Sequence, residues 1–143
     1  MNSRRKFIQK TALIGTGVAL SPSMTFGIFN ANQNNKLNVG LIGVGLRGAN
    51  HLENLLLRSD INITAICDID SNRIEIAKKL LEKSNAKSPK VFGSNPYDYR
   101  NLLELKEVDA VLIATPWLWH TRMAVDAMKA GKYAGVEVSA SST

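Results

Sequence analysis

Residues 37–48 read LNVGLIGVGLRG, and this stretch decides the fold. Its first half is a short apolar run typical of a β-strand. Its second half holds three glycines spaced G-x-G-x-x-G, and apolar residues at helical spacing follow over 49–58. Because glycines are common in turns, the spacing alone also fits a plain strand-to-helix turn. The position between a strand and a helix favours a loop that binds phosphate groups.

Each glycine has a physical role in such a loop. Gly43 lets the chain turn sharply, Gly45 has no side chain to block a pyrophosphate, and Gly48 lets helix and strand pack closely. The start of the helix then offers free N–H groups and a partial positive charge to the phosphates. The stretch therefore predicts a dinucleotide site.

From Lys36 onward the chain alternates apolar runs with segments of helical spacing. This order predicts a parallel sheet with helices on both faces, the Rossmann-type α/β fold. The run VDAVLIAT at 108–115 is apolar almost throughout, as expected for a strand buried on both faces. The other expected strands are 61–67, 91–92 and 132–139, and the other expected helices run through 74–81, 97–105 and 121–130.

Asp68 ends the second expected strand, 23 residues after Gly45. An acidic residue about 20 residues beyond the loop accepts hydrogen bonds from the hydroxyls of the adenosine ribose. A 2′-phosphate would be repelled there, so Asp68 favours NAD over NADP, and Arg73 is the one nearby residue that could soften this preference. Asp68 could instead cap the next helix, although Asp70 is better placed for capping.

The sequence ATPWLWH follows the fourth expected strand, and Pro116 fixes the turn. Ligands of open α/β sheets bind at the carboxyl ends of the strands. Large flat side chains there can wall off a nicotinamide or a sugar ring, so Trp117 and Trp119 are candidate contacts. His120 fits two roles equally well, a cofactor contact or a cap of the next helix.

Glu137 stands near the carboxyl end of the last apolar run. A lone buried carboxylate is costly unless it has a partner or a function, so Glu137 is a candidate site residue. His51 lies in the first helix and is interpreted as a surface or packing residue. Cys67, the only cysteine, is interpreted as a small core residue, and a single cysteine allows no internal disulfide.

The N-terminus has the form of a secretory signal. Residues 1–10 are basic, and the apolar run at 12–20 is far shorter than the ~20 residues that span a bilayer, so no stable membrane anchor is expected. The stretch SRRKFIQK, with Arg4 and Arg5, resembles the twin-arginine signal and predicts a periplasmic or exported protein. The expected organisation is a signal segment at 1–29, a polar linker at 30–36 and a folded domain at 37–143.

The charge balance argues against a nucleic-acid partner. The chain has 18 Lys and Arg against 12 Asp and Glu, but four of the basic residues fall within the first ten positions. The remaining 14 against 12 leave a net charge of +2, with no basic stripe interleaved with aromatics. No metal site is predicted either.

Together these features resemble the glucose–fructose oxidoreductase/inositol dehydrogenase/rhizopine-catabolism superfamily. The shared stretches are GVGLRG, CDID, DAVLIATP with a later histidine, and an acid-containing strand after AGKY. The closer resemblance is to glycoside hydrolase family 109, NAD-dependent α-N-acetylgalactosaminidases, through GLRG, KVFG, ATPW-WH, AMKAGKY and VEVSA. Leu118 departs from it, because the family usually has glutamate there. Val138 and Ser139 follow Glu137 where many superfamily dehydrogenases have Lys-Pro, which agrees with the glycosidase branch.

The resemblance implies NAD as the cofactor and also implies its contacts. Leu46 and Arg47 would contact the cofactor phosphates, and Asp68 the ribose. The residues implied along the nicotinamide half are Trp117, Leu118, Trp119 and His120, with Glu137 and Val138 beside them.

The resemblance also implies a glycosidase that does not use paired carboxylates. In the family, the sugar 3-hydroxyl is oxidised by NAD, the acidified C2 proton is removed, the group at C1 leaves, water adds, and the ketone is reduced again. The implied substrate is a glycan with terminal N-acetylgalactosamine. The acid and base side chains come largely from a second, C-terminal domain. We therefore expect the chain to stop before that domain and to hold a cofactor half-site without catalytic residues.

Export and an NAD site fit together in such an enzyme. An exported protein meets no nicotinamide pool, so it must bind NAD in the cytoplasm and leave in folded form through the twin-arginine machinery. A glycosidase that restores its own NAD in each cycle keeps working there. Two alternatives stay open, a periplasmic sugar oxidoreductase of the glucose–fructose type and a non-catalytic NAD-binding module.

Overall fold

The computed structural model describes residues 36–138. The expected signal segment and nearly all of the linker lie outside the described residues, as do the last five positions. The elements in chain order are β1 (Leu37–Ile42), α2 (Leu46–Leu56), β2 (Ile61–Cys67), α3 (Ser71–Lys83), β3 (Lys90–Phe92), α4 (Tyr99–Leu103), β4 (Ala110–Ile113), α5 (Trp117–Lys129) and β5 (Tyr133–Val136).

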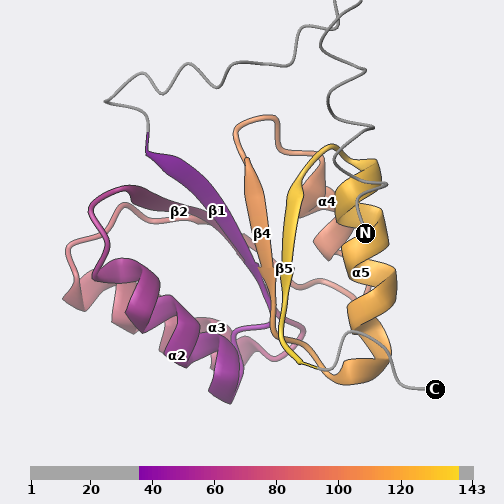
Figure 1. Cartoon of the computed structure of the whole chain (residues 1–143). Helices are drawn as coiled ribbons and strands as arrows, with labels where there is room; N and C mark the ends of the chain where they lie inside the picture. Colours follow the sequence, from indigo (N-terminus) through magenta and orange to yellow (C-terminus); the bar gives the residue numbers. More distant parts are fainter. Residues whose placement is uncertain (1–35, 139–143) are drawn as a thin grey trace, which may run out of the picture. The chain divides into compact units, whose positions relative to one another are not determined.

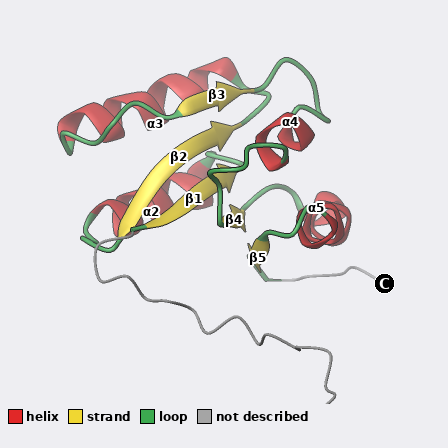
Figure 2. Ribbon diagram, turned by 90° about the horizontal axis from the view of Figure 1, so that it is seen from above, coloured by secondary structure: helices red, strands yellow, loops and turns green. Residues whose placement is uncertain are grey.

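The five strands form one parallel sheet in the order β3-β2-β1-β4-β5. Helices α2 and α3 cover one face of the sheet, and α4 and α5 cover the other (Figures 1 and 2). This arrangement confirms the expected Rossmann-type fold. The chain builds outward from β1 to β3 and then returns to place β4 on the other side of β1, so a crevice opens between the carboxyl ends of β1 and β4.

The sheet separates two hydrophobic clusters, a first one under α2 and α3 and a second one under α4 and α5. Gly40 of β1 lies between them without a side chain, and its backbone packs against Leu102 of α4. Cys67 is 5% exposed and belongs to the second cluster, as expected of a core residue. The first cluster contains Val39, Leu41, Val44, Leu52, Ile63, Ile66, Ala77 and Leu81. The second contains Ile42, Ala65, Cys67, Tyr99, Leu102, Leu103, Val108, Val111, Ile113, Met123 and Ala127.

The start of α5 corrects the sequence prediction, which placed the helix at 121–130. The helix begins at Trp117, with Pro116 as its N-cap at φ −59°, and the N–H of Trp119 donates to the Pro116 carbonyl. Proline has a fixed φ that suits a helix start, and this outweighs the weak helix propensity of the aromatic residues after it. The helix ends as expected before Gly131, whose φ of +74° suits glycine.

The last strand is also shorter than expected and lies at the edge of the sheet. β5 ends at Val136, so Glu137 follows the strand instead of interrupting it. Tyr133 is 63% exposed and Gly135 is exposed, so one face of this strand is open to solvent. Within residues 36–138, no helix is both long enough and apolar enough to cross a bilayer.

Candidate cofactor site

The glycine loop between β1 and α2 has the geometry that the sequence predicts. Gly43 has φ +89°, and a Cβ atom there would lie 2.8 Å from the carbonyl oxygen of Ala114. A Cβ on Gly48 would lie 2.0 Å from the carbonyl oxygen of Gly43. A Cβ on Gly45 would meet nothing within 4 Å, so this glycine borders open space. The loop is therefore tight at two glycines and open at the third, where a phosphate can approach the backbone.

The N-terminus of α2 is suited to an anion. Its N-cap is Gly45, no side chain caps the helix, and the first turn contains no acidic residue. The first N–H groups of a helix have no partner inside the helix, and they carry the positive end of its dipole. Leu46 and Arg47 lie in this exposed first turn, so their backbone can face a bound pyrophosphate.

Asp68 follows β2 and faces the loop. Its Oδ2 accepts a hydrogen bond from the N–H of Val44 at 2.8 Å, and its Oδ1 accepts one from the N–H of Asp70 at 3.0 Å. The cap of α3 is Asp70, which accepts from the N–H of Asn72, so the alternative that Asp68 caps the helix is wrong. Each oxygen of Asp68 keeps a second lone pair for a ligand hydroxyl.

A cavity of about 190 Å³ opens beside this carboxylate, and we call it the Asp68 cavity. Its walls come from the carboxyl ends of β1, β2 and β4, from the loop after β3 and from α5. Ile69, Pro96, Trp119 and Met123 make one side of it apolar, which suits a flat ring. Burial, with the charges of Asp98 and Asp68, raises the pKa of the Cys67 thiol in its wall to about 12, so the thiol stays protonated at neutral pH.

The loop from Gly93 to Asp98 is held by the buried carboxylate of Asp98. Its Oδ2 accepts from the N–H groups of Gly93 at 2.6 Å and Ser94 at 2.8 Å, and Asn101 donates to Oδ1 at 2.6 Å. These bonds, led by the two from the backbone, lower the pKa of Asp98 to about 2. Helix α4 is shorter than the helix expected at 97–105, because the residues at both of its ends form turns with i→i+3 bonds, from the N–H of Arg100 to the Tyr97 carbonyl and from the N–H of Leu105 to the Leu102 carbonyl.

A second cavity of about 300 Å³ lies on the other side of the turn between β4 and α5, and we call it the Glu137 cavity. It shares Ala114 and Thr115 with the Asp68 cavity. Its remaining wall residues come from α2, α5 and the segment after β5, and they are Arg47, Trp117, His120, Glu137 and Val138.

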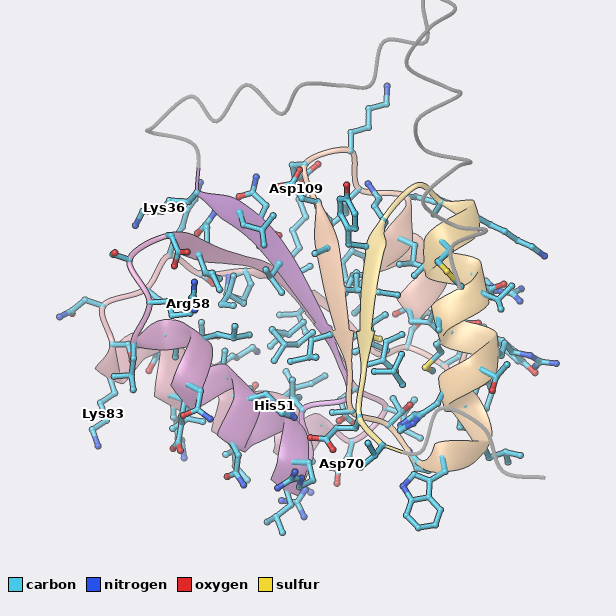
Figure 3. All side chains as sticks on the ribbon, in the orientation of Figure 1. Lys36, His51, Arg58, Asp70, Lys83 and Asp109 are labelled. Carbon is cyan, nitrogen blue, oxygen red and sulfur yellow. The ribbon has the colours of Figure 1, made fainter. Side chains whose placement is uncertain are left out.

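Glu137 is paired, which is one of the two conditions expected from the sequence for a carboxylate at this position. Its side chain is 16% exposed, and its Oε1 accepts from Arg47 Nη2 at 3.1 Å and from His51 Nε2. The hydrogen bond from His51, followed by the charge of Arg47, lowers the pKa of Glu137 below its usual value. His51, interpreted from the sequence as a surface or packing residue, thus also contacts the carboxylate of Glu137. Figure 3 shows His51 on α2 pointing toward the carboxyl ends of the strands.

The four residues from Trp117 to His120 form one helical turn and so point in different directions. Trp117 lines the Glu137 cavity and Trp119 lines the Asp68 cavity. Trp119 also meets Tyr97 edge to face, with 5.5 Å between the ring centroids. Leu118 is 82% exposed and borders neither cavity. The implied placement of all four along one half of the cofactor stays a prediction, and this geometry divides them between two cavities.

His120 is buried, with its Nε2 at 2.6 Å from the carbonyl oxygen of Thr115. Since a carbonyl only accepts, this nitrogen donates. The bond ties the first turn of α5 to the end of β4. This hydrogen bond therefore stabilises the turn between the two cavities. His120 also lines the Glu137 cavity.

Comparison with known proteins identifies the fold. The family described as "Oxidoreductase family, NAD-binding Rossmann fold" matches residues 37–138. The chain belongs to this family. The match confirms the superfamily resemblance and makes the described domain an NAD-binding one.

The curated relatives confirm the closer resemblance as well. A "Glycosyl hydrolase family 109 protein" of Parabacteroides distasonis is 38% identical in an alignment that covers 99% of this chain and 33% of that protein. An "Alpha-N-acetylgalactosaminidase" of Tannerella forsythia is 37% identical over 99% of this chain and 34% of its own length. The chain thus spans about a third of these relatives.

Solved structures share the fold of this oxidoreductase-family domain. Myo-inositol 2-dehydrogenase from Lactobacillus plantarum is 27% identical with a TM-score of 0.63, over 75% of this chain and 29% of that one. Scyllo-inositol dehydrogenase from Lactobacillus casei, solved with NAD(H) and scyllo-inositol, has a TM-score of 0.64 over 76% of this chain and 30% of that one. At 22% identity, the second likeness concerns the fold alone.

Sequence reasoning missed two parts of the site. One is His51, whose only signal was its place on the helix that opens at the glycine loop. The other is the loop after β3, which contributes Asn95 and Pro96 to the Asp68 cavity. Its signal was the stretch GSNPYD, in which turn residues precede an aspartate that can bind the backbone of its own loop.

Proposed function

We propose that this domain serves an NAD-dependent glycosidase that removes terminal α-N-acetylgalactosamine by transient oxidation at sugar C3, elimination, addition of water and re-reduction. The observation that carries the proposal is the similarity to family 109 proteins along 99% of the chain. The Glu-Val-Ser sequence after β5 supports it, because the lysine expected of many superfamily dehydrogenases is absent there. Since the chain spans a third of those relatives, the activity is proposed for a protein of their length.

In this proposal each of the two cavities holds one half of the NAD molecule. The N–H groups at the start of α2 and the open side of Gly45 hold the pyrophosphate, with Arg47 nearby. Asp68 accepts from the ribose hydroxyls, and the apolar wall of the Asp68 cavity takes the adenine ring. The nicotinamide half and the sugar then meet in the Glu137 cavity.

The chemistry that NAD supplies there is acceptance of a hydride from the sugar and its later return. The residues of this chain bind and orient. Trp117 offers an exposed aromatic face for a sugar or nicotinamide ring, and Glu137 offers an ionised carboxylate that accepts hydrogen bonds. The acid and base for C2 and C1 are proposed to lie outside residues 36–138.

The test is to incubate an aryl α-N-acetylgalactosaminide with the chain and, in parallel, with a longer protein of the relatives' length that begins with this domain. We expect the longer protein to release the free aglycone without net formation of NADH, because the cycle restores NAD. The 143-residue chain should bind NAD without turnover. Net NADH without release of aglycone would contradict the proposal and identify a sugar oxidoreductase.

We further propose export by the twin-arginine machinery, which transports folded cargo and so suits a protein loaded with NAD in the cytoplasm. The paired guanidinium groups of Arg4 and Arg5 are the feature that its receptor would read. Replacing both by lysine should retain the protein in the cytoplasm, as measured by cell fractionation. A control with Lys6 and Lys10 replaced by arginine should still be exported. Normal export of the double-lysine variant would rule out the twin-arginine route.

A further inference from the structure

We propose that His51 is a positioning residue that holds Oε1 of Glu137 from α2, so that Oε2 is presented to a ligand in the Glu137 cavity. The inference rests on the proposed function, because it assigns that cavity to the nicotinamide half of the cofactor. It adds a residue that lies outside the wall of the cavity and that neither the sequence pattern nor the family resemblance assigned.

The first observation is that the two carboxylate oxygens of Glu137 differ in their hydrogen bonds. Both hydrogen bonds that the Glu137 carboxylate makes within residues 36–138 end on Oε1. In the described part of the chain, Oε2 makes none. A carboxylate has about four acceptor sites, so a group fixed through one oxygen can still receive an N–H or O–H donor at the other.

The second observation is the difference between the two donors. Arg47 is 67% exposed, and it stands in the first turn of α2, where a pyrophosphate is expected. His51 is 29% exposed and belongs to the second turn of the same helix. When Arg47 turns toward a phosphate, His51 is the donor that stays with Glu137. A short, ring-limited side chain also fixes an orientation better than a long flexible one.

The charge state of Glu137 determines which group carries the proton in the contact between Glu137 and His51. Glu137 is ionised at neutral pH, since its pKa is lowered, and an ionised carboxylate only accepts. His51 therefore carries its proton on Nε2, whether the ring is neutral or charged. The charged or titratable groups around the carboxylate are Arg47 and His51 from α2, with His120 of α5 on the same cavity wall.

The backbone supports this arrangement. The N–H of Glu137 donates to the Ile113 carbonyl at 3.0 Å, which continues the ladder between β5 and β4. The backbone position is thus fixed by the sheet, and the side chain is fixed by α2. A catalytic or binding group needs such supporting contacts to keep its geometry within about 0.5 Å of the productive one.

The experiment compares four forms of the 143-residue chain by calorimetry with NAD and with ADP, which lacks the nicotinamide half. The variant His51→Leu removes the donor at similar size, His51→Gln keeps a donor N–H at a similar reach, and Asn50→Leu is the matched control on an exposed neighbour in α2. We expect NAD to bind about tenfold more weakly to His51→Leu, the scale of a hydrogen bond to a charged group. His51→Gln should stay within about twofold of the parent, and ADP should bind all four forms alike.

A carbon-13 NMR titration of the Glu137 carboxyl provides an independent readout. Its pKa should rise toward the usual glutamate value in His51→Leu and remain lowered in His51→Gln, because the bond from His51 is the main cause of the lowering. An unchanged Glu137 pKa in His51→Leu, or equal losses of NAD and ADP affinity, would overturn the positioning role. If the parent chain bound neither NAD nor ADP, the proposed function would fail while the NMR titration still decided the role of His51.

Discussion

Replacing Gly48 by alanine should destabilise the domain by about 3 kcal/mol or more, the upper range for overpacking in a tight site. The new Cβ would lie 2.0 Å from the carbonyl oxygen of Gly43 and 2.8 Å from its carbonyl carbon. Both atoms are backbone, and Gly43 is itself held by the bond from its N–H to the Cys67 carbonyl at 2.7 Å. Neither partner can move without breaking the link between β1 and β2.

Chemical denaturation followed by circular dichroism would measure this loss. Gly40→Ala is the matched control, because its Cβ would meet the Cδ2 atom of Leu102 at 2.8 Å, and the end of a flexible side chain can shift. We expect the control to lose clearly less stability than Gly48→Ala. Equal stability of Gly48→Ala and the parent would show that α2 can move away from β1 at no cost, which contradicts the close packing described above.

Gly45→Ala should have the opposite effect, with the fold preserved and NAD binding weakened about 100-fold. Gly45 has a φ of −64°, outside the left-handed region that favours glycine, and nothing lies within 4 Å of its Cβ position. The free energy of unfolding should therefore change by no more than about 0.5 kcal/mol, as for a surface substitution. The added methyl group fills the space in which the pyrophosphate approaches the backbone, and losing one or two charged hydrogen bonds accounts for the drop in affinity.

Calorimetry with NAD on the two alanine variants separates the roles of the glycines. A Gly45→Ala protein that binds NAD as tightly as the parent would mean that no phosphate approaches at this point. The loop would then be the plain strand-to-helix turn that the spacing alone allowed. Unfolding of Gly45→Ala at much lower denaturant would point to a packing role and would also contradict the assignment.

The fold and one half of the site could be predicted because local patterns carry them. The period of apolar residues gives the order of strands and helices, and that order leaves few parallel topologies. The glycine loop and Asp68 follow from spacing, since both lie within one strand–helix–strand unit. The cap of α3 at Asp70 was also predictable, because a helix cap is a contact between near neighbours in sequence.

The wall residues of the Glu137 cavity were named as candidates from motifs and from the family resemblance, but the contacts among them depend on strand order, which no local pattern gives. His51 and Glu137 are 86 residues apart, and they meet because β4 lies between β1 and β5. The prediction of where α5 begins was wrong for a different reason. Trp117 and Trp119 have weak helix propensity, but a proline directly before them suits the start of a helix.

The bond from Val44 to Asp68 has a consequence for the entropy of binding. A glycine-rich loop loses much conformational freedom when it becomes ordered, and a loop that orders only around its ligand subtracts that loss from the affinity. Here the carboxylate of Asp68 accepts a hydrogen bond from the N–H of Val44 at 2.8 Å, and this contact lies entirely within the protein. The ordering is thus completed during folding, so the amide hydrogen of Val44 should exchange slowly with solvent even in the ligand-free protein, and the arriving dinucleotide meets a loop already in its binding shape.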